Sequence, residues 1–252
     1  MAPSDLFYLA LVATALVLDH FVFWRRFAGR PHIDPGTARL ALWRTWIGML
    51  WVLSLAAMAL WVHHGRRWGL LGLVPPTGWR LWASAGLFLA VIALYAPTLA
   101  KLGRIAPARR AALRARFGSH AAMLPHTRPE LAWFTALSLT AGFCEELVFR
   151  GYLVWVFQPF IGIWGAAAVS CVVFALAHSY QGAGGVLKTG LIGTVFMLAV
   201  LASGSLIPAI AIHALIDVAQ GVVAWLVLRE GPADSLDGVV DGGTIGQAPL
   251  KA

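Results

Sequence analysis

Three short groups of ionisable residues lie within strongly apolar stretches in the second half of the chain. They are the segments Glu145–Arg150, Phe174–His178 and His213–Asp217. An ionisable side chain in a membrane-spanning helix costs free energy, so such a residue is a functional candidate by default. The six candidate site residues are Glu145, Glu146, Arg150, His178, His213 and Asp217.

The two adjacent glutamates are predicted to face different directions. Glu146 and Arg150 are four residues apart, so on a helix they share a face and can form an ion pair. Glu145 lies about 100° around the helix from Glu146, away from that arginine. A desolvated carboxylate without a paired cation is more basic than one in water, which suits a general base.

The two histidines are expected on helices other than the one that carries the glutamates. Peptide hydrolysis needs a water, a base that deprotonates it and donors for the developing oxyanion. Glu145 and His178 could hold and activate the water, and His213 could donate to the oxyanion. Asp217 shares a helix face with His213, so it could orient that ring, or donate itself if protonated. Singly, each group could instead be an ion pair, an interface histidine, a packing hydrogen bond or a proton relay.

The elements that must position these residues are predicted to be membrane-spanning helices. The chain has 252 residues, of which 60% are hydrophobic and 12% charged, and an ordinary soluble domain carries about twice that charge. Its mean hydropathy is +0.76. We expect an all-α fold, a polytopic transmembrane bundle of about seven spanning helices with the catalytic core in the C-terminal four. The apolar runs are Leu6–Trp24, Thr45–Val62, Leu81–Ala100, Leu131–Phe157, Ile161–His178, Leu187–Ala202 and Leu206–Leu228.

Three regions follow from this pattern. Residues 1–128 would form N-terminal transmembrane helices with basic loops, residues 129–230 the catalytic transmembrane core, and residues 231–252 a disordered tail rich in Gly and Asp. Within the first region, Gly103–Met123 is rich in Arg and Ala. It could form an amphipathic helix on the membrane surface, or a solvated basic loop.

The formal net charge of +8 is explained by loop arginines that orient the chain and meet anionic head groups, and no nucleic-acid partner is expected. The odd-numbered loops and the tail carry fifteen basic residues and the even-numbered loops three. The positive-inside rule then places the N-terminus outside and the C-terminus in the cytoplasm. The preference for Arg over Lys, sixteen to three, suggests a bacterial cell membrane. Asp19 and His20, near the end of the first run, could pair with Arg25 or Arg26.

Together the three groups resemble the CPBP family, the CAAX-protease and bacteriocin-processing intramembrane proteases that include the Rce1-type prenyl endopeptidases. The motifs are Glu-Glu-x-x-x-Arg, Phe-x-x-x-His and His-x-x-x-Asp, and the resemblance covers about residues 130–220. It implies a glutamate-dependent, metal-independent endopeptidase without a cofactor. Its substrate would be a membrane-embedded or lipid-anchored protein or peptide.

The resemblance also implies roles for the residues that match the motifs. Glu145 and His178 would hold the catalytic water, while His213 and Asp217 would form the oxyanion side. Glu146 and Arg150 would support the site. Family members carry Asn or Asp at the position of Asp217, and Asp donates a hydrogen bond only when protonated, so its role stays open.

Two other classes of function fit the same residues. A zinc-dependent intramembrane peptidase could use His178, His213 and Glu145 as ligands, although the chain has no His-Glu-x-x-His motif. A catalytically silent scaffold, an immunity protein or a transporter could use the same groups for packing or for moving protons.

Overall fold

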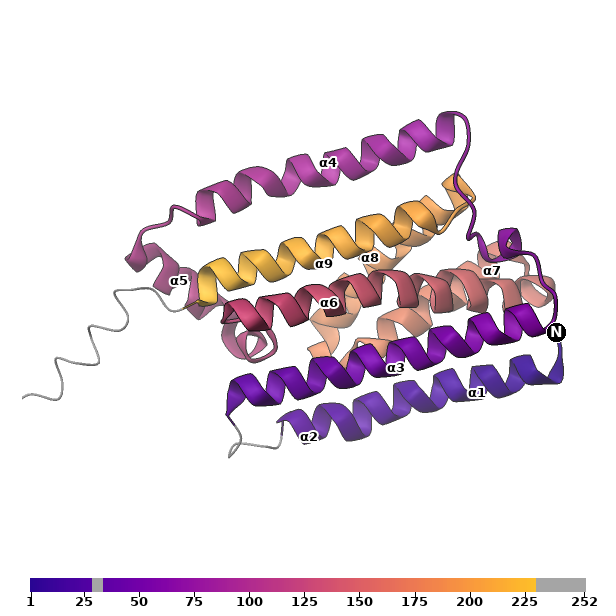
Figure 1. Ribbon diagram of the computed structural model, residues 1–252, viewed down its shortest axis with the longest axis horizontal. Coiled ribbons are helices and arrows are strands. Elements are labelled where there is room, and N and C mark those ends of the chain that lie inside the picture. Colours follow the sequence, from indigo (N-terminus) through magenta and orange to yellow (C-terminus); the bar gives the residue numbers. More distant parts are fainter. Residues whose placement is uncertain (29–33, 230–252) are drawn as a thin grey trace, which may run out of the picture.

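The computed structural model describes residues 1–28 and 34–229, and every regular element in these ranges is a helix. This confirms the predicted all-α class. The predicted disordered tail, residues 231–252, lies outside the described residues. Figure 1 shows elongated helices that run roughly side by side, with α4 (Trp79–Leu102) along one edge of the bundle.

Six described segments are long and apolar enough to cross a membrane, with mean hydropathies between 1.8 and 2.2. In hydrocarbon a helix is favoured because it satisfies every backbone N–H and C=O internally. The six segments are Pro3–Phe27, Pro35–His63, Trp79–Leu102, Arg128–Ala177, Ser179–Ser203 and Ile207–Leu228. They contain α1 (Pro3–Leu18) with α2 (Trp24–Ala28), α3 (Pro35–His63), α4, α6 (Arg128–Glu145) with α7 (Val154–Ala177), α8 (Gly182–Ser203) and α9 (Ile207–Leu228).

The longest segment folds back on itself. A π-helical stretch, Glu146–Leu153, joins α6 to α7, and within α7 the backbone of Gly162 has φ +69°. This left-handed conformation is accessible to glycine at little cost, and it reverses the chain. The Ser170 hydroxyl consequently donates to the Phe149 carbonyl oxygen at 2.7 Å, although 21 positions separate them. If the parts of this segment before and after Gly162 are counted as two spans, the total is the seven spans predicted from the sequence.

One end of the bundle is tied together by a buried carboxylate near the N-terminus. Both oxygens of Asp5 accept hydrogen bonds from the Arg66 guanidinium at 2.8 Å, and the Tyr152 hydroxyl donates to Oδ1 at 2.5 Å. Asp5 is fully buried. Three segments far apart in the sequence, namely the start of α1, the loop after α3 and the π-helical stretch, are thereby fixed to one another.

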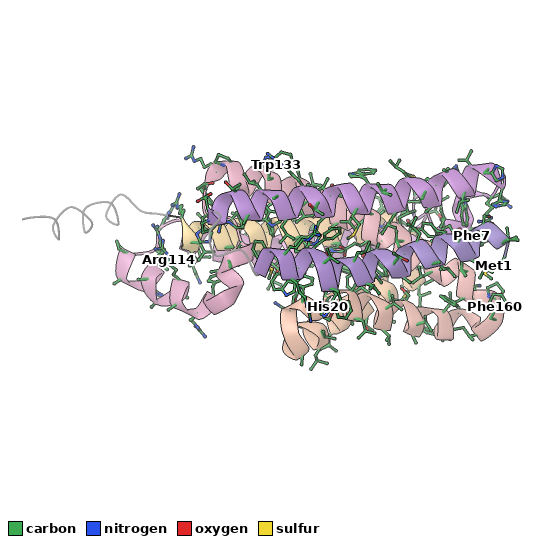
Figure 2. The ribbon with its side chains drawn as sticks, turned by 90° about the horizontal axis from the view of Figure 1, so that it is seen from below. Met1, Phe7, His20, Arg114, Trp133 and Phe160 are labelled. Atoms are coloured by element: carbon green, nitrogen blue, oxygen red, sulfur yellow. The ribbon has the colours of Figure 1, made fainter. Side chains whose placement is uncertain are left out.

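The opposite end carries a short basic helix, α5 (Pro107–Phe117), followed by a 3-10 turn, Gly118–Met123. The Arg114 guanidinium donates to the carbonyl oxygens of Leu228 and Arg229 at the end of α9. Figures 1 and 2 place α5 and Arg114 at this end, away from the N-terminus. Of the two alternatives for Gly103–Met123, the helix is therefore present, while its position on a membrane surface stays a prediction.

The same end is also joined by an ion pair between two spanning helices. The Arg39 guanidinium of α3 donates to Oε1 of Glu130 at 2.8 Å, and both side chains are buried. Glu130 also completes the N-terminal cap of α6, because its Oε2 accepts from the backbone N–H groups of His126 and Thr127. This pairing fixes α3 beside the start of the helix that carries the glutamates.

Candidate active site

A close crossing of α6 and α9 brings the glutamates to the histidine motif. A Cβ atom added at Gly142 would lie 2.8 Å from the Cβ of Ala214 and 2.9 Å from its backbone nitrogen. Only glycine permits this approach, as small residues do where membrane helices pack tightly. One turn after Gly142, α6 ends at Glu145 and the π-helical stretch begins at Glu146. The residue before Ala214 is His213, so the crossing places these three side chains together.

Glu146 is the centre of the polar contacts. Its Oε1 accepts from Nη1 of Arg150 at 3.1 Å, which is the pairing expected from their spacing, and from Nδ1 of His213 at 2.8 Å. The side chains of Glu146 and Arg150 are both 0% exposed. The contact with His213 was not foreseen from the sequence, because 67 positions separate the two residues.

The buried arginine is compensated on three sides. Besides Glu146, its Nη2 donates to the Gly193 carbonyl oxygen of α8 at 3.1 Å. The guanidinium carbon lies 3.8 Å from the centre of the Phe174 ring, a cation–π contact. A Cβ at Gly193 would lie 2.9 Å from Nη2 and 2.8 Å from the Phe174 ring, so glycine makes room for the arginine here. The phenylalanine of the second motif therefore packs against the arginine of the first.

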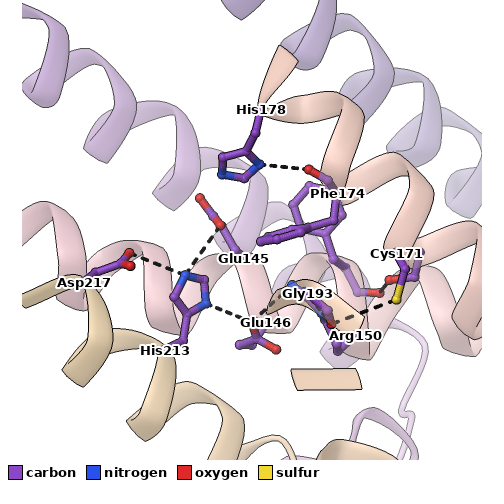
Figure 3. Close-up of polar contacts among 11 residues, drawn as sticks. Glu145, Glu146, Arg150, Cys171, Phe174, His178, Gly193, His213 and Asp217 are labelled. Atoms are coloured by element: carbon purple, nitrogen blue, oxygen red, sulfur yellow. Dashed lines mark hydrogen bonds and ion pairs between the residues drawn. The ribbon is translucent and has the colours of Figure 1, made fainter. Parts of the chain in front are cut away.

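His178 is held in one tautomer by the backbone. Its Nδ1 lies 2.8 Å from the Phe174 carbonyl oxygen, at the end of α7. A carbonyl oxygen can only accept, so Nδ1 carries a proton and donates it. In the neutral ring Nε2 is then an acceptor with a free lone pair, and Figure 3 shows the His178 ring next to the Glu145 carboxylate.

The other two carboxylates of the group face His213. Its Nε2 lies 3.9 Å from Oε2 of Glu145 and 3.5 Å from Oδ2 of Asp217. Since Nδ1 donates to Glu146, a second proton on Nε2 would point at both carboxylates. The His213 ring is fixed from the side by stacking on Phe196, with ring centres 4.9 Å apart. Asp217 therefore lies where it can orient His213, one of the two roles expected for it.

A cavity of about 480 Å³ divides the six residues into two sets. Glu145, His178, His213 and Asp217 line it, whereas Glu146 and Arg150 lie behind its wall. Much of the remaining wall is apolar and comes from α1, α3, α6 and α9 as well as from the end of α5 and the segment that follows it. Among the apolar lining residues are Leu16, Trp43, Met49, Leu53, Phe117, Leu124, Phe134, Leu137 and Ile216.

The N-terminal half contributes polar groups to this cavity that the sequence interpretation missed. Asp19 lines it and accepts a hydrogen bond from the Trp46 indole at 2.5 Å, and His20 contacts the Ser179 hydroxyl at 2.9 Å. The suggested pairing of Asp19 and His20 with Arg25 or Arg26 was therefore wrong. The signal was available, because Asp19 is itself an ionisable residue in an apolar run.

The described residues do not form a recognisable metal centre. None of their groups of three or more His, Cys, Asp or Glu side chains is arranged to hold a metal ion. Nδ1 of each site histidine already has a protein partner, so Nε2 is the nitrogen that each presents to its surroundings.

Comparison with known proteins gives one match. Residues 127–219 match the family model described as Rce1-like, the type II CAAX prenyl endopeptidases. Searches of the curated proteins and of the solved structures found no match. The resemblance seen in the three motifs is thus confirmed over the part of the chain that holds all six candidate residues, and it indicates a CAAX-protease type of hydrolase.

Proposed function

We propose, on the premise that residues 127–219 are an Rce1-like domain in an integral membrane protein, that this chain is an intramembrane endopeptidase. It hydrolyses peptide bonds of membrane-embedded or lipid-anchored substrates with a water activated by Glu145. The observation that carries the proposal is the shared cavity, into which Glu145, His178, His213 and Asp217 project from three separate helices.

The two glutamates have different environments, and this supports their different roles. Glu146 is bound by an arginine and a histidine and lies outside the cavity lining. Glu145 lines the cavity, and its contact with an ionisable group there is the one with His213, whose Nε2 lies 3.9 Å from Oε2. A carboxylate that is engaged by two donors is a poor base, whereas one that is exposed to a small desolvated space is well suited to take a proton.

The first step uses the acceptors on one side of the cavity. A water between Glu145 and His178 can donate one O–H to the carboxylate and the other to Nε2 of the histidine. The oxygen lone pair then faces a peptide carbonyl in the cavity. As the oxygen attacks the carbonyl carbon, Glu145 takes the proton and a C–O bond forms.

The second step uses the donor on the other side. His213, with Nδ1–H held by Glu146, can present Nε2–H to the oxyanion, and nearby carboxylates stabilise a doubly protonated ring. Collapse of the tetrahedral species breaks the C–N bond, and protonated Glu145 returns its proton to the leaving amine nitrogen. Asp217 acts here by orienting His213 rather than by direct contact with the substrate.

The same helices give the protein its proposed place in the membrane. The basic α5, α2 and the end of α9 lie at one end of the bundle and the N-terminus lies at the other (Figure 1). This supports a cytoplasmic C-terminus and an N-terminus outside, by the positive-inside rule. The proposed core at residues 129–230 then lies within the bilayer.

The deciding experiment compares the wild type with Glu145→Gln on a co-expressed CAAX-type substrate and on a peptide library in detergent. Both assays are repeated with a metal chelator. We expect the wild type to cleave with the chelator present and Glu145→Gln to lose about a hundredfold to ten-thousandfold in kcat. Asp34→Asn, an isosteric change at an exposed helix cap, is the matched control.

Two outcomes favour the other functions. Loss of wild-type cleavage on chelation, restored by added zinc, would support the zinc-dependent peptidase. Equal cleavage by the wild type and Glu145→Gln would remove Glu145 from the mechanism. If no substrate in either assay is cleaved, the silent scaffold, immunity or transport protein becomes the better account.

A further inference from the structure

A second polar site lies on the cavity wall, formed by the N-terminal helices together with the 3-10 turn after α7, Ser179–Gln181. Asp19 begins a π-helical turn, Asp19–Phe23, that follows α1. It is only 6% exposed, and it lines the same cavity as Glu145 and His178. π-Helical turns within spanning helices frequently mark functional positions.

Asp19 has one satisfied oxygen and one free oxygen. Oδ1 accepts from the Trp46 indole nitrogen, whereas none of the described residues donates a hydrogen bond to Oδ2. Nor does any described Arg or Lys form an ion pair with it; Lys188 of α8 lines the same cavity without reaching it. A charged carboxylate in a desolvated cavity is costly, although His178 and His20 interact favourably with this one. A cation that binds in the cavity would stabilise the ionised form of Asp19 over the protonated one.

An aromatic cluster adjoins this carboxylate through Trp46, the residue whose indole donates to it. The Tyr180 ring lies 5.5 Å from Trp46 and 5.3 Å from Trp24, measured between ring centres. Trp46 and Tyr180 also line the cavity. Aromatic faces attract ammonium and guanidinium groups, most strongly where water is excluded. A carboxylate combined with Trp and Tyr rings is therefore suited to a cation that brings its own apolar stem.

We infer that Asp19, Trp46 and Tyr180 form a subsite for a cationic side chain, Lys or Arg, of the peptide bound for cleavage. The inference rests on the proposed endopeptidase function, since it assigns the occupant of the same cavity. Asp19 is a specificity residue in this arrangement: it forms an ion pair with the bound peptide and takes no part in the bond that breaks. The first span thereby becomes part of the substrate site, outside the region that matches the family model.

Binding is measured first, so that cleavage is not required. The protein is Glu145→Gln in detergent, and the probes are fluorescent peptides of one apolar sequence with a single Lys moved through each position. Matched peptides carry norleucine, which keeps the four-carbon stem and removes the charge. At the position that meets Asp19 we expect the Lys peptide to bind about tenfold more tightly or better, as buried charge pairs at interfaces do.

Three variants test the assignment. Asp19→Asn keeps an oxygen for the Trp46 indole and removes the charge, so the Lys preference should disappear while norleucine peptides bind as before. Asp19→Glu should retain the preference. Asp34→Asn, which removes the same charge at an exposed helix cap and leaves a residue that caps equally well, should leave it unchanged.

The results separate this inference from the proposed function. A Lys preference that survives Asp19→Asn, or the absence of a Lys preference at every position, overturns the subsite. The same peptides are then offered to the wild type for cleavage. Cleavage without a Lys preference rejects the role of Asp19 and leaves the endopeptidase intact, while Lys-dependent binding without cleavage keeps the subsite and rejects the endopeptidase.

Discussion

Glu146 and His213 are joined by a 2.8 Å hydrogen bond between Oε1 and Nδ1, across 67 positions of sequence. The same Oε1 also accepts from Arg150 in the π-helical stretch. One buried oxygen therefore holds both this arginine and the histidine of α9. Figure 3 shows the consequence: the His213 ring is turned so that its other nitrogen faces Glu145 and Asp217. Glu146 is thus a positioning residue, acting through His213.

The two glutamates should differ sharply in their effect on stability. Glu146→Gln leaves the buried Arg150 guanidinium without its counter-ion, and breaking a buried pair in this way costs about 3–5 kcal/mol. Glu145→Gln removes only the longer contact of 3.9 Å with His213, so it should unfold close to the wild type. Thermal unfolding of both variants in the same detergent measures the difference. The double variant Glu146→Gln/Arg150→Met should recover part of the loss, and equal stability of the two single variants would contradict this assignment.

The α6–α9 crossing should not tolerate a side chain at Gly142. Gly142→Val places new atoms against Ala214 and separates the helix of Glu145 from that of His213. A displacement of about 1 Å is enough to lower a rate about a hundredfold, so we expect kcat to fall at least that far while helix content by circular dichroism is retained. Gly48→Val on α3 is the control, because a Cβ there meets nothing within 4 Å. Full activity of Gly142→Val would show that the close crossing is dispensable.

The N-terminal carboxylate is expected to stabilise the whole bundle. Asp5→Asn removes the negative charge that accepts two hydrogen bonds from the Arg66 guanidinium. It also replaces the carboxylate oxygen that accepts from the Tyr152 hydroxyl, and the Asp5 side chain is buried. We expect a loss of about 3 kcal/mol or more in unfolding free energy, because Arg66 is left without its partner. Asp34→Asn provides the comparison at an exposed site, where Asn caps α3 as well as Asp does. Unfolding of Asp5→Asn at the wild-type temperature would be inconsistent with this role.

Labelling with a membrane-impermeant maleimide tests the orientation. In a background with Cys144→Ala and Cys171→Ala, single cysteines replace Arg67, in the loop after α3, or Arg109 of α5; both positions are exposed. With the N-terminus outside, we expect Arg67→Cys to react in intact cells and Arg109→Cys only after permeabilisation. The reverse pattern would invert the proposed topology.

Hydrophobicity and length alone determined the number of spans. The apolar runs match the helices to within a few residues at most ends, because a stretch that crosses hydrocarbon must be about 20 residues long and helical. The exception is α3, which starts at Pro35, ten positions before the predicted Thr45. Its first turns include Arg39. This charged residue interrupts the apolar run in the sequence, but in the folded protein it forms a buried ion pair with Glu130, so the helix can include it. The Glu146–Arg150 contact was predictable too, because it depends only on the helical repeat.

The tertiary structure decided everything that depends on how the helices are rotated and where they cross. Spanning helices that are apolar on all sides give no periodic signal for the face that points inward. For this reason the sequence could not show that Glu146 contacts His213, nor that Asp19 lines the cavity. These contacts follow from steric fits between distant residues, such as Gly142 against Ala214 and Gly193 against Arg150. Such fits are set by the shapes of two surfaces meeting, and a single stretch of sequence describes only one of them.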